Sequence, residues 1–359
     1  MQRICVVSQC ADSAHNIASI EMLAGRLSAL TGASLLPTRQ DFDESSDAFL
    51  VPTFAMVRAD GHPEMSVETF FGGIVDHGFM ATKLVTHPHL HDNDKLPEGW
   101  AEGFAARLKD CVLEGYSVFS HDHAKEAAEL LIKKHKIRFK NPYSSGGNDQ
   151  TVVHSRQALE TFLETVSAAE MAKGLVVEED VENSTTYSVG QVRLLDQTGS
   201  YLGRQYTVDG PDGFPVYAGS RLWVVRGGWD ALLLNLQSPI SRSIVAKARQ
   251  YDEAATQHLG LIASRKNYDV LVGPITETGF RCGVLEQSWR IGGASPAEVL
   301  AMEKFAQNRN ISAVQAVIRE DHGHPRKINA DDFVVYSGND DLGLPLQKIA
   351  RVEKIHYDP

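Results

Sequence analysis

The sequence predicts a mixed α/β (α+β) protein in which strands and helices alternate first and strands dominate later. An apolar strand over residues 4–8 is followed at once by an amphipathic helix over residues 13–32, an order that is typical of an α/β layer. Helices and strands alternate again between residues 122 and 179. Beyond Thr185 the hydrophobic period becomes strand-like, interrupted by one long helix.

The helices are placed by their apolar spacing and their end signals. In the first helix, apolar side chains recur at spacings of three and four, and Gly32 ends it. Ser155 is expected to cap a later helix with its side chain. The other helices are expected over residues 100–115, 122–134 and 241–258, and from Ser295-Pro296 onward.

The remaining strands are placed by short apolar or alternating runs between turn signals. Residues 33–69 show a weak pattern and are not assigned in detail. The expected strands cover residues 137–140, 151–154, 174–179, 187–195, 201–208, 222–225, 268–272 and 282–287.

Length and charge limit the classes of protein. The 359 residues suit two or three packed subdomains. The formal net charge of −11 argues against a nucleic-acid partner, because phosphate backbones select basic faces. The most apolar stretch, residues 231–236, is far shorter than the roughly 20 residues that span a bilayer, so no membrane partner is expected.

The four cysteines are scattered and form no Cys-x-x-Cys pair. In a chain of this length they are expected to be reduced, small core residues rather than a disulfide framework or a zinc site. We therefore expect a cytoplasmic protein. The cysteines are Cys5, Cys10, Cys111 and Cys282.

The first segment with chemical potential is Lys140 and the small-residue loop that follows it. A lysine at the end of a strand can contact phosphate, and backbone N–H groups approach phosphate oxygens where side chains are small. The loop includes Gly146 and Gly147, and it lacks the Gly-Lys-Ser/Thr end of a P-loop. Taken alone, the loop is more typical of an ordinary turn than of a phosphate site.

The second segment is the acidic run that follows the strand over residues 174–179. Glu178, Glu179 and Asp180 are consecutive. Such a run is usually a solvated strand end. In a nucleotide site it would instead be a hinge whose backbone groups meet the adenine edge.

The third segment is a pair of acid-bearing strands. Asn267 and Asp269 share one face of the first strand, and Glu286, Ser288 and Arg290 share a face of the second if extension continues. Pairing the strands through the turn near residues 276–279 would bring Asp269 and Glu286 within reach of one hard cation. The alternative is a surface hairpin with alternating acids.

In this order, the three segments resemble the ATP-grasp superfamily. Residues 286–290 are similar to the Glu-x-Asn-x-Arg stretch of biotin carboxylase-like and carbamoyl-phosphate-synthase-like members. The whole chain also looks like a bacterial family of unassigned function within that superfamily. That likeness runs through residues 71–73, 81–83, 186–191 and 284–295.

The resemblance implies an ATP-grasp fold in three parts. Residues 1–115 would form a Rossmann-like pre-ATP-grasp domain, and residues 116–183 a small glycine-loop lid subdomain. Residues 184–359 would form an antiparallel-sheet subdomain that carries the metal and substrate sites.

The resemblance also implies ATP and Mg²⁺ as cofactors and assigns the nucleotide contacts. Lys140 would contact the α- and β-phosphates, with Lys83 as the earlier nucleotide-binding lysine. The loop through Gly146, Gly147 and Gln150 would fold over the phosphates as a lid. The hinge residues that would meet adenine, largely through backbone atoms, are Glu178, Glu179 and Val181.

The same likeness assigns the metal and acceptor contacts. Asp269, Glu286 and Ser288 would hold Mg²⁺, and Arg290 would receive the anionic acceptor or the acyl phosphate. Arg221 and Arg226 are both candidates for a further phosphate contact. Three positions depart from the superfamily pattern: Ser288 replaces an asparagine, Thr186 replaces an acid, and Asp149 adds negative charge near the phosphates.

The implied activity is a carboxylate–amine (or thiol) ligase that forms an acyl phosphate on a small-molecule substrate. The alternatives are a small-molecule kinase on the same fold and a non-catalytic, nucleotide-binding regulatory protein. The oligomeric state stays open, with a homodimer as one alternative. His87, His89 and His91 could share a strand face and bind a metal, but Pro88 and the following polar residues favour a surface loop.

Overall fold

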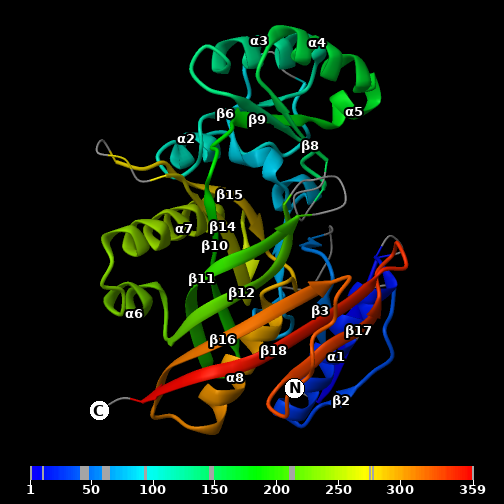
Figure 1. The fold of residues 1–359 in the computed structure, drawn as a ribbon, viewed down its shortest axis with the longest axis vertical. Helices are drawn as coiled ribbons and strands as arrows, with labels where there is room; N and C mark the ends of the chain where they lie inside the picture. The colour runs from blue at the N-terminus through cyan, green and yellow to red at the C-terminus, as the bar shows by residue number, and fades with distance from the viewer. Residues whose placement is uncertain are drawn as a thin grey trace.

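The computed structural model describes residues 2–9, 12–40, 48–58, 65–92, 95–144, 149–209, 215–274, 276 and 279–357. Its strands form four sheets, the largest of which has eight strands (Figure 1). The predicted mixed α/β fold class is confirmed.

The chain opens with a small parallel sheet. β1 (Arg3–Val7) lies between β2 (Ser34–Leu35) and β3 (Ala48–Pro52) and is parallel to both. The helix α1 (Ala14–Thr31) makes the first crossover, with Ser13 at its N-cap and Gly32, at φ 71°, at its C-cap. The predicted strand, helix and glycine stop are therefore confirmed.

A second small sheet and several short turns follow. Its strands are β4 (Met56–Val57), β5 (Gly73–Val75) and β13 (Ile262–Ala263). They lead to the 3₁₀ turns η1 (Gly78–Ala81) and η2 (Lys83–Thr86) and to the short helix α2 (Phe104–Leu108).

The helix predicted over residues 100–115 is mostly wrong. Only α2 is α-helical, because Gly103 adopts a left-handed φ of 81° immediately before it. Beyond the helix, Val112 forms an isolated parallel bridge to Val284, and Gly115 begins a strand. Tertiary pairing with a distant strand thus overrides the helical spacing of the apolar residues.

The lid part is a four-stranded antiparallel sheet covered by helices, seen at the top of Figure 1. Its helices each begin at a serine whose side chain accepts a backbone N–H. In spatial order the strands are β6 (Gly115–Val118), β9 (Leu175–Glu179), β7 (Ile137–Lys140) and β8 (Gln150–Val153). The helices are α3 (His121–Leu131), α4 (Arg156–Thr165) and α5 (Ala168–Lys173).

The large sheet is antiparallel and carries the C-terminal half of the chain. Three of its strands, at the C-terminal end, were not assigned from the sequence. In spatial order the strands are β15 (Cys282–Ser288), β14 (Arg265–Val272), β10 (Thr185–Leu194), β11 (Gln197–Asp209), β12 (Pro215–Arg226), β16 (Ile311–His322), β18 (Pro345–Tyr357) and β17 (Phe333–Asn339).

Helices cover this sheet and join it to the N-terminal part. α6 (Trp229–Leu234) and α7 (Pro239–His258) lie beside its first strands, and α8 (Ser295–Gln307) packs against β16 (Figure 1). Ile4 and Leu23 share one hydrophobic core with Phe305, so the N-terminal sheet and the large sheet stabilise each other. The lid part has a separate core. The domain boundaries at 115/116 and 183/184 stay predictions.

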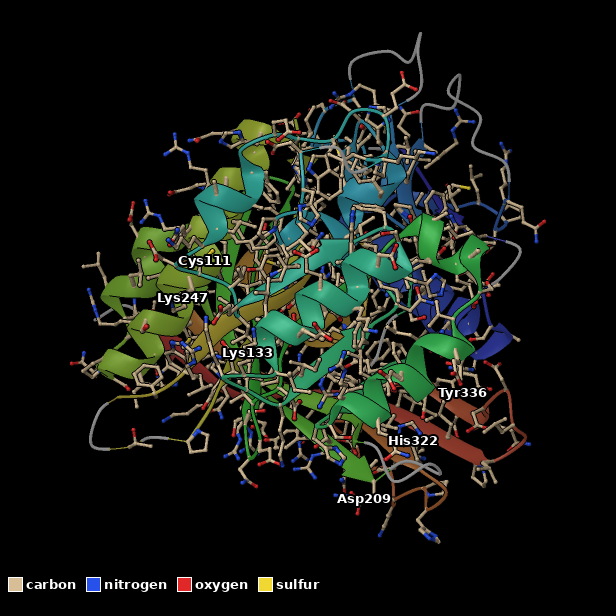
Figure 2. The ribbon with its side chains drawn as sticks, turned by 90° about the horizontal axis from the view of Figure 1, so that it is seen from above. Cys111, Lys133, Asp209, Lys247, His322 and Tyr336 are labelled. Carbon is tan, nitrogen blue, oxygen red and sulfur yellow. The ribbon has the colours of Figure 1, made fainter. Side chains whose placement is uncertain are left out.

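The cysteines in the described part of the chain are free. Cys5 and Cys111 are buried and Cys282 is half-buried, while Cys10 lies outside the described residues. Burial raises the pKa of the Cys111 thiol to about 12, although Lys247 is close to it (Figure 2). Among the described helices, none is long and apolar enough to span a membrane.

We predict that Gly219→Ala destabilises the large sheet. Gly219 has a φ of 122°, and a Cβ there would lie 2.1 Å from the carbonyl oxygen of Ile318 on the neighbouring strand. Strain and overlap together should lower the free energy of unfolding by about 2–4 kcal/mol in urea denaturation. Gly25→Ala is the control, because nothing lies within 4 Å of a Cβ at that helical position. It should raise stability by about 0.5–1 kcal/mol, and equal midpoints for the two variants would contradict the assignment.

Candidate functional site

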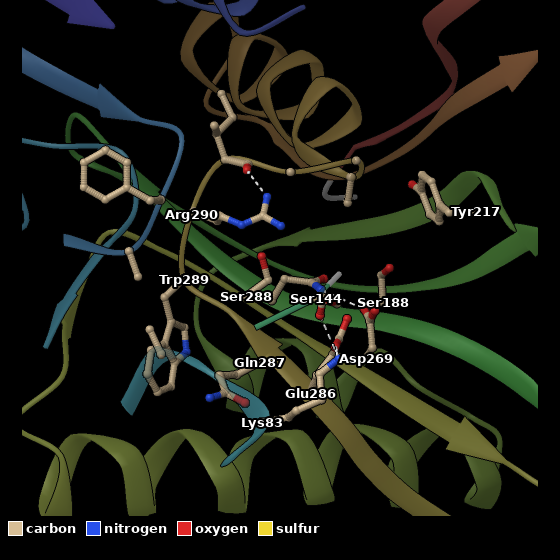
Figure 3. Close-up of a pocket in the computed structure, with 18 of the residues that line it drawn as sticks. Lys83, Ser144, Ser188, Tyr217, Asp269, Glu286, Gln287, Ser288, Trp289 and Arg290 are labelled. Atoms are coloured by element: carbon tan, nitrogen blue, oxygen red, sulfur yellow. Dashed lines mark hydrogen bonds and ion pairs between the residues drawn. The ribbon is translucent and has the colours of Figure 1, made fainter. Parts of the chain in front are cut away.

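A cleft of about 1520 Å³ lies where the three parts of the chain meet. Its walls include Asp12 from the N-terminal part, Lys140 from the lid sheet and Asp269 from the large sheet. Figure 3 shows the acids and Arg290 facing this space. Segments more than 200 residues apart therefore contribute to one site, which the sequence order alone does not show.

The centre of the cleft is formed by two acids on adjacent strands. Asp269 on β14 and Glu286 on β15 are directly opposite in the antiparallel register, and a β-bulge follows Asp269. Asp269 Oδ1 accepts hydrogen bonds from Gln205 Nε2 at 2.8 Å and from Asn267 Nδ2 at 2.9 Å. The structure thus brings together the two acids that the strand alternation predicted.

The two carboxylates repel each other. Burial and the neighbouring Glu286 charge raise the pKa of Asp269 from 3.8 to about 6. A divalent cation between the acids would relieve this repulsion, and carboxylate and amide oxygens are the ligands that Mg²⁺ prefers. The donor set therefore fits a hard cation. Among the described residues, no third His, Cys, Asp or Glu joins these two acids to complete a metal-ligand group, so further ligands would come from Ser288, substrate or water.

The end of β15 carries the two remaining residues of this motif. Ser288 lies opposite Asn267 across the strand pair. Arg290, just beyond the strand, donates from Nη1 to the Ile291 carbonyl at 3.1 Å, with the rest of its guanidinium in the cleft (Figure 3). Burial, with a smaller effect from Arg265, lowers the pKa of Arg290. Trp289 between them is 1% exposed and packs in the core at the wall of the cleft.

Lys83 connects the acid pair to the base of the lid loop. Its side chain is 4% exposed, and Nζ lies 2.8 Å from Glu286 Oε2. Nζ also donates to the carbonyl of Ser144 at 2.9 Å. A lysine placed in this way can contact a phosphate that is bound at the same cation.

Lys140 is buried beside a carboxylate on the neighbouring strand. Its Nζ forms an ion pair with Glu178 Oε1, and His87 Nε2 lies 3.1 Å from Glu178 Oε2. Burial opposes ionisation of Glu178, but the Lys140 charge and the hydrogen bond from His87 outweigh it and lower the pKa of that carboxyl to about 2. The Glu178 carboxylate thus positions Lys140, a role that the sequence did not suggest for this residue.

The other two hinge acids are also paired. Glu179 Oε2 accepts from Arg281 Nη2 at 2.6 Å, and Asp180 Oδ1 accepts from Arg138 at 2.7 and 2.9 Å. Val181 lies on the cleft wall next to them. The acidic run is therefore neutralised by neighbouring cations rather than solvated.

Only part of the predicted lid loop is described. Gly146 and Gly147 lie outside the described residues. Gln150 is on β8 and lines the cleft, and its Oε1 accepts from Arg138 Nη1 at 3.0 Å. Asp149 bonds to the hydroxyl of Ser144, so its carboxylate has a local partner.

Two sets of predicted candidates lie elsewhere. Arg221 pairs with Glu353 at 2.8 Å and the Arg226 guanidinium stacks on Phe305; neither residue is among those that line the cleft. Both were candidates for a phosphate contact, and the geometry does not support either, because their guanidinium groups contact β18 and α8 instead of the cleft.

The histidine run does not form a metal site in the described chain. His87 points to Glu178, whereas His91 Nε2 is 2.9 Å from Glu126 and His89 is 3.8 Å from Glu102. The three rings thus reach different carboxylates, and the extended strand that would align them is absent.

The roles of three contributors to the site were not predicted from the sequence. They are Gln205, which holds Asp269, His87, which holds Glu178, and Arg265 behind Ser288. An alternating strand over residues 201–208 was predicted, but nothing in it indicates which residue meets a strand that is 60 residues away.

The fold is that of the ATP-grasp proteins. Biotin carboxylase from Campylobacter jejuni has a TM-score of 0.55 at 11% identity, covering 98% of this chain and 87% of that one. Carboxyaminoimidazole ribonucleotide synthase from Aspergillus clavatus, complexed with ATP, has a TM-score of 0.54 at 10% identity over 98% and 93%. Phosphoribosylamine–glycine ligase from Thermotoga maritima has a TM-score of 0.51 at 11% identity over 99% and 97%.

The chain belongs to DUF3182, a family described as proteins of unknown function, whose model matches residues 4–350. It is also 28% identical over 116 residues to a uridylate kinase from Methanospirillum hungatei. That match covers 32% of this chain and 45% of the kinase, so the chain spans less than half the length of this curated relative.

We predict that the acid pair makes stability depend on pH. Because the pKa of Asp269 is raised to about 6 in the folded state, the Asp269 carboxyl stays protonated between pH 4 and 6, whereas in the unfolded chain it is ionised. The free energy of unfolding should therefore fall by about 1–3 kcal/mol as the pH rises from 4 to 6 in the absence of Mg²⁺. Asp269→Asn should remove this fall and be more stable than wild type at pH 7, but not at pH 4.

Urea denaturation at the two pH values measures this difference. The control is Asp230→Asn, since the Asp230 side chain is 82% exposed and the change should alter stability little at either pH. A wild-type protein and an Asp269→Asn variant with parallel pH profiles would contradict the electrostatic account of the pair.

Proposed function

We propose that this protein is an ATP- and Mg²⁺-dependent ligase that joins a small-molecule carboxylate to an amine through an acyl phosphate. The single observation that carries the proposal is the facing pair Asp269 and Glu286, with the buried Lys83 at 2.8 Å from Glu286, in one large cleft. This arrangement places oxygen ligands for a metal ion next to a lysine ammonium that can bind phosphate. The ATP-grasp fold agrees with it.

In this proposal the two buried lysines bind the phosphates by exchanging partners. Lys83 is paired with Glu286 and Lys140 with Glu178, so neither ammonium is an uncompensated buried charge. When Mg²⁺ binds Glu286, Lys83 becomes available to a phosphate oxygen at little cost in desolvation. Each charge-assisted bond to phosphate would contribute about 1.5–3 kcal/mol.

The acceptor would lie at the other end of the cleft, beyond Arg290. That end is lined by Asp12 and His15 near the start of α1, and by Glu320 and Lys348 on paired strands. The Arg290 guanidinium, with its free edge in the cleft, would hold the substrate carboxylate next to the γ-phosphate (Figure 3). The mixture of acids and bases suits a small polar substrate.

The proposed chemistry has two transfers. A carboxylate oxygen attacks the γ-phosphorus and the bond to ADP breaks; the amine then attacks the acyl carbon, expels phosphate and loses a proton. Asp269 and Glu286 would hold the Mg²⁺, which would supply neutralisation of the phosphate charge. The chain's own residues position and desolvate: Arg290 orients the carboxylate and Lys83 and Lys140 orient the phosphates.

One observation favours a second candidate, a nucleotide-binding protein without turnover. Ser288 replaces the usual asparagine, and its Oγ already accepts a hydrogen bond from Arg265 Nη1 at 3.3 Å. A weaker metal ligand would reduce catalysis more than nucleotide binding. A kinase that stops after the first transfer shares all of the residues above.

We predict that Lys140→Ala and Glu286→Gln each weaken Mg²⁺-ATP binding by about 10- to 100-fold in calorimetry, because each removes one charge-assisted contact. Lys266→Ala is the matched control, since Lys266 pairs with the buried Asp252 at 2.7 Å outside the cleft wall. It should leave the affinity unchanged. Wild-type affinity in both site variants would show that the nucleotide binds elsewhere.

Product analysis separates the activities. For a ligase, inorganic phosphate and ADP should accumulate only when an acid and an amine are both present, and Arg290→Lys should raise the KM for the acid more than for ATP, because a lysine cannot hold a carboxylate with two bonds. A phosphorylated acid as the final product would identify a kinase. Tight ATP binding without product across the panel would support the non-catalytic candidate.

A further inference from the structure

A buried ion pair lies directly behind the candidate cation site. Arg265, the first residue of β14, and Glu298 on α8 are each 1% exposed. Their contact is bidentate, with Nε to Oε2 at 3.0 Å and Nη2 to Oε1 at 2.7 Å. The pair joins the strand that carries Asp269 to the helix that follows Arg290 in the chain.

The third guanidinium nitrogen of Arg265 reaches the end of β15. Nη1 donates to the carbonyl of Ser288 at 3.0 Å, lies 3.3 Å from Ser288 Oγ and also donates to the carbonyl of Arg290. Two carbonyls on either side of Trp289 are thereby held toward one donor. This fixes the direction in which the chain leaves the strand.

The carboxylate of Glu298 continues the network to the acid pair. The Tyr201 hydroxyl is the shared donor between Glu298 Oε1, at 2.6 Å, and Asn267 Oδ1, at 3.0 Å. The Asn267 amide in turn donates to Asp269 at 2.9 Å. The ion pair thus reaches the candidate cation site from both sides, through Ser288 on one strand and through Asn267 on the other.

Stability alone does not require this arrangement. A buried ion pair stabilises the folded state little more than apolar side chains of the same size, because both charges lose their hydration. Replacing both residues with apolar ones therefore often leaves stability unchanged or raises it. The cost of removing only one partner is high, because the other charge is left buried. An apolar pair at these two positions could give similar stability, but it could not make the hydrogen bonds by which Arg265 and Glu298 reach the site.

We propose that Arg265 and Glu298 are positioning residues for the cation site. The pair holds Ser288, Asn267 and the backbone of Arg290 in place. The oxygen ligands of the cation site and the Arg290 guanidinium then face the same bound metal and nucleotide. This inference rests on the proposed Mg²⁺-nucleotide binding and adds residues that the strand motif does not contain. Partners of this kind typically contribute 10- to 100-fold to metal affinity.

The test is a double substitution, Arg265→Met with Glu298→Leu, which removes both buried charges together. The matched control is Arg26→Met with Glu303→Leu, because that pair is also bidentate, at 2.7 and 2.5 Å, and ends on the same helix, yet neither residue is in the cleft wall. ADP binding is measured by calorimetry with Mg²⁺ and with EDTA, and folding by urea denaturation.

We expect the site double variant to bind ADP in EDTA like wild type and to lose 10-fold or more of the affinity gained on adding Mg²⁺. The control should keep that gain. A full Mg²⁺-dependent gain in the site double variant would overturn the positioning role, whatever its stability. A wild-type protein without any Mg²⁺-dependent gain would overturn the proposed function itself, and this inference with it.

A second variant keeps the test decisive if the double variant does not fold. Tyr201→Phe leaves the ion pair intact and removes only the hydroxyl between Glu298 and Asn267. It should reduce the Mg²⁺-dependent gain by 3-fold or more without changing ADP binding in EDTA. An unchanged gain in this variant, with the double variant unfolded, would assign a purely structural role to the pair.

Discussion

The register between β14 and β15 is the constraint on which the candidate site depends. It sets Asp269 opposite Glu286 and Asn267 opposite Ser288, with a bulge after Asp269. A shift of β15 by one residue would turn Glu286 away from Asp269 to the other face, where Gln287 and Trp289 now face the core and α7. The apolar side chains on that face therefore determine which residues meet in the cleft.

Most acids of the cleft region are paired with cations, as the proposed nucleotide site would require. Four acids of the cleft region each have a cationic partner: Lys83 with Glu286, Lys140 with Glu178, Arg281 with Glu179 and Arg138 with Asp180. Such pairing stabilises buried lysines in the absence of ligand, and a bound metal and phosphate can replace the partners. The net charge of −11 is therefore compatible with a cleft in which these four acids are neutralised.

Much of the fold could be predicted because its signals are local. The strand over residues 137–140, the helix begun by Ser155 and the helix ended by Gly32 follow from alternation and capping, which act within one element. The helix over residues 100–115 could not, because Gly103 and the bridge of Val112 to Val284 interrupt it. The positions of Arg221 and Arg226 outside the cleft could not be predicted either, because their partners lie on β18 and on α8.

The sequence by itself determined the class of fold and the acids that can share a strand face, since side-chain alternation is a property of each strand. Only the tertiary structure decided which side chains pair with one another around the site. The pairs are Glu178 with Lys140, Gln205 with Asp269, and Arg265 with Glu298. These contacts join positions up to 64 residues apart, as for Gln205 and Asp269. Which side chains meet over such separations depends on how the sheet and helices pack, and no local pattern contains that information.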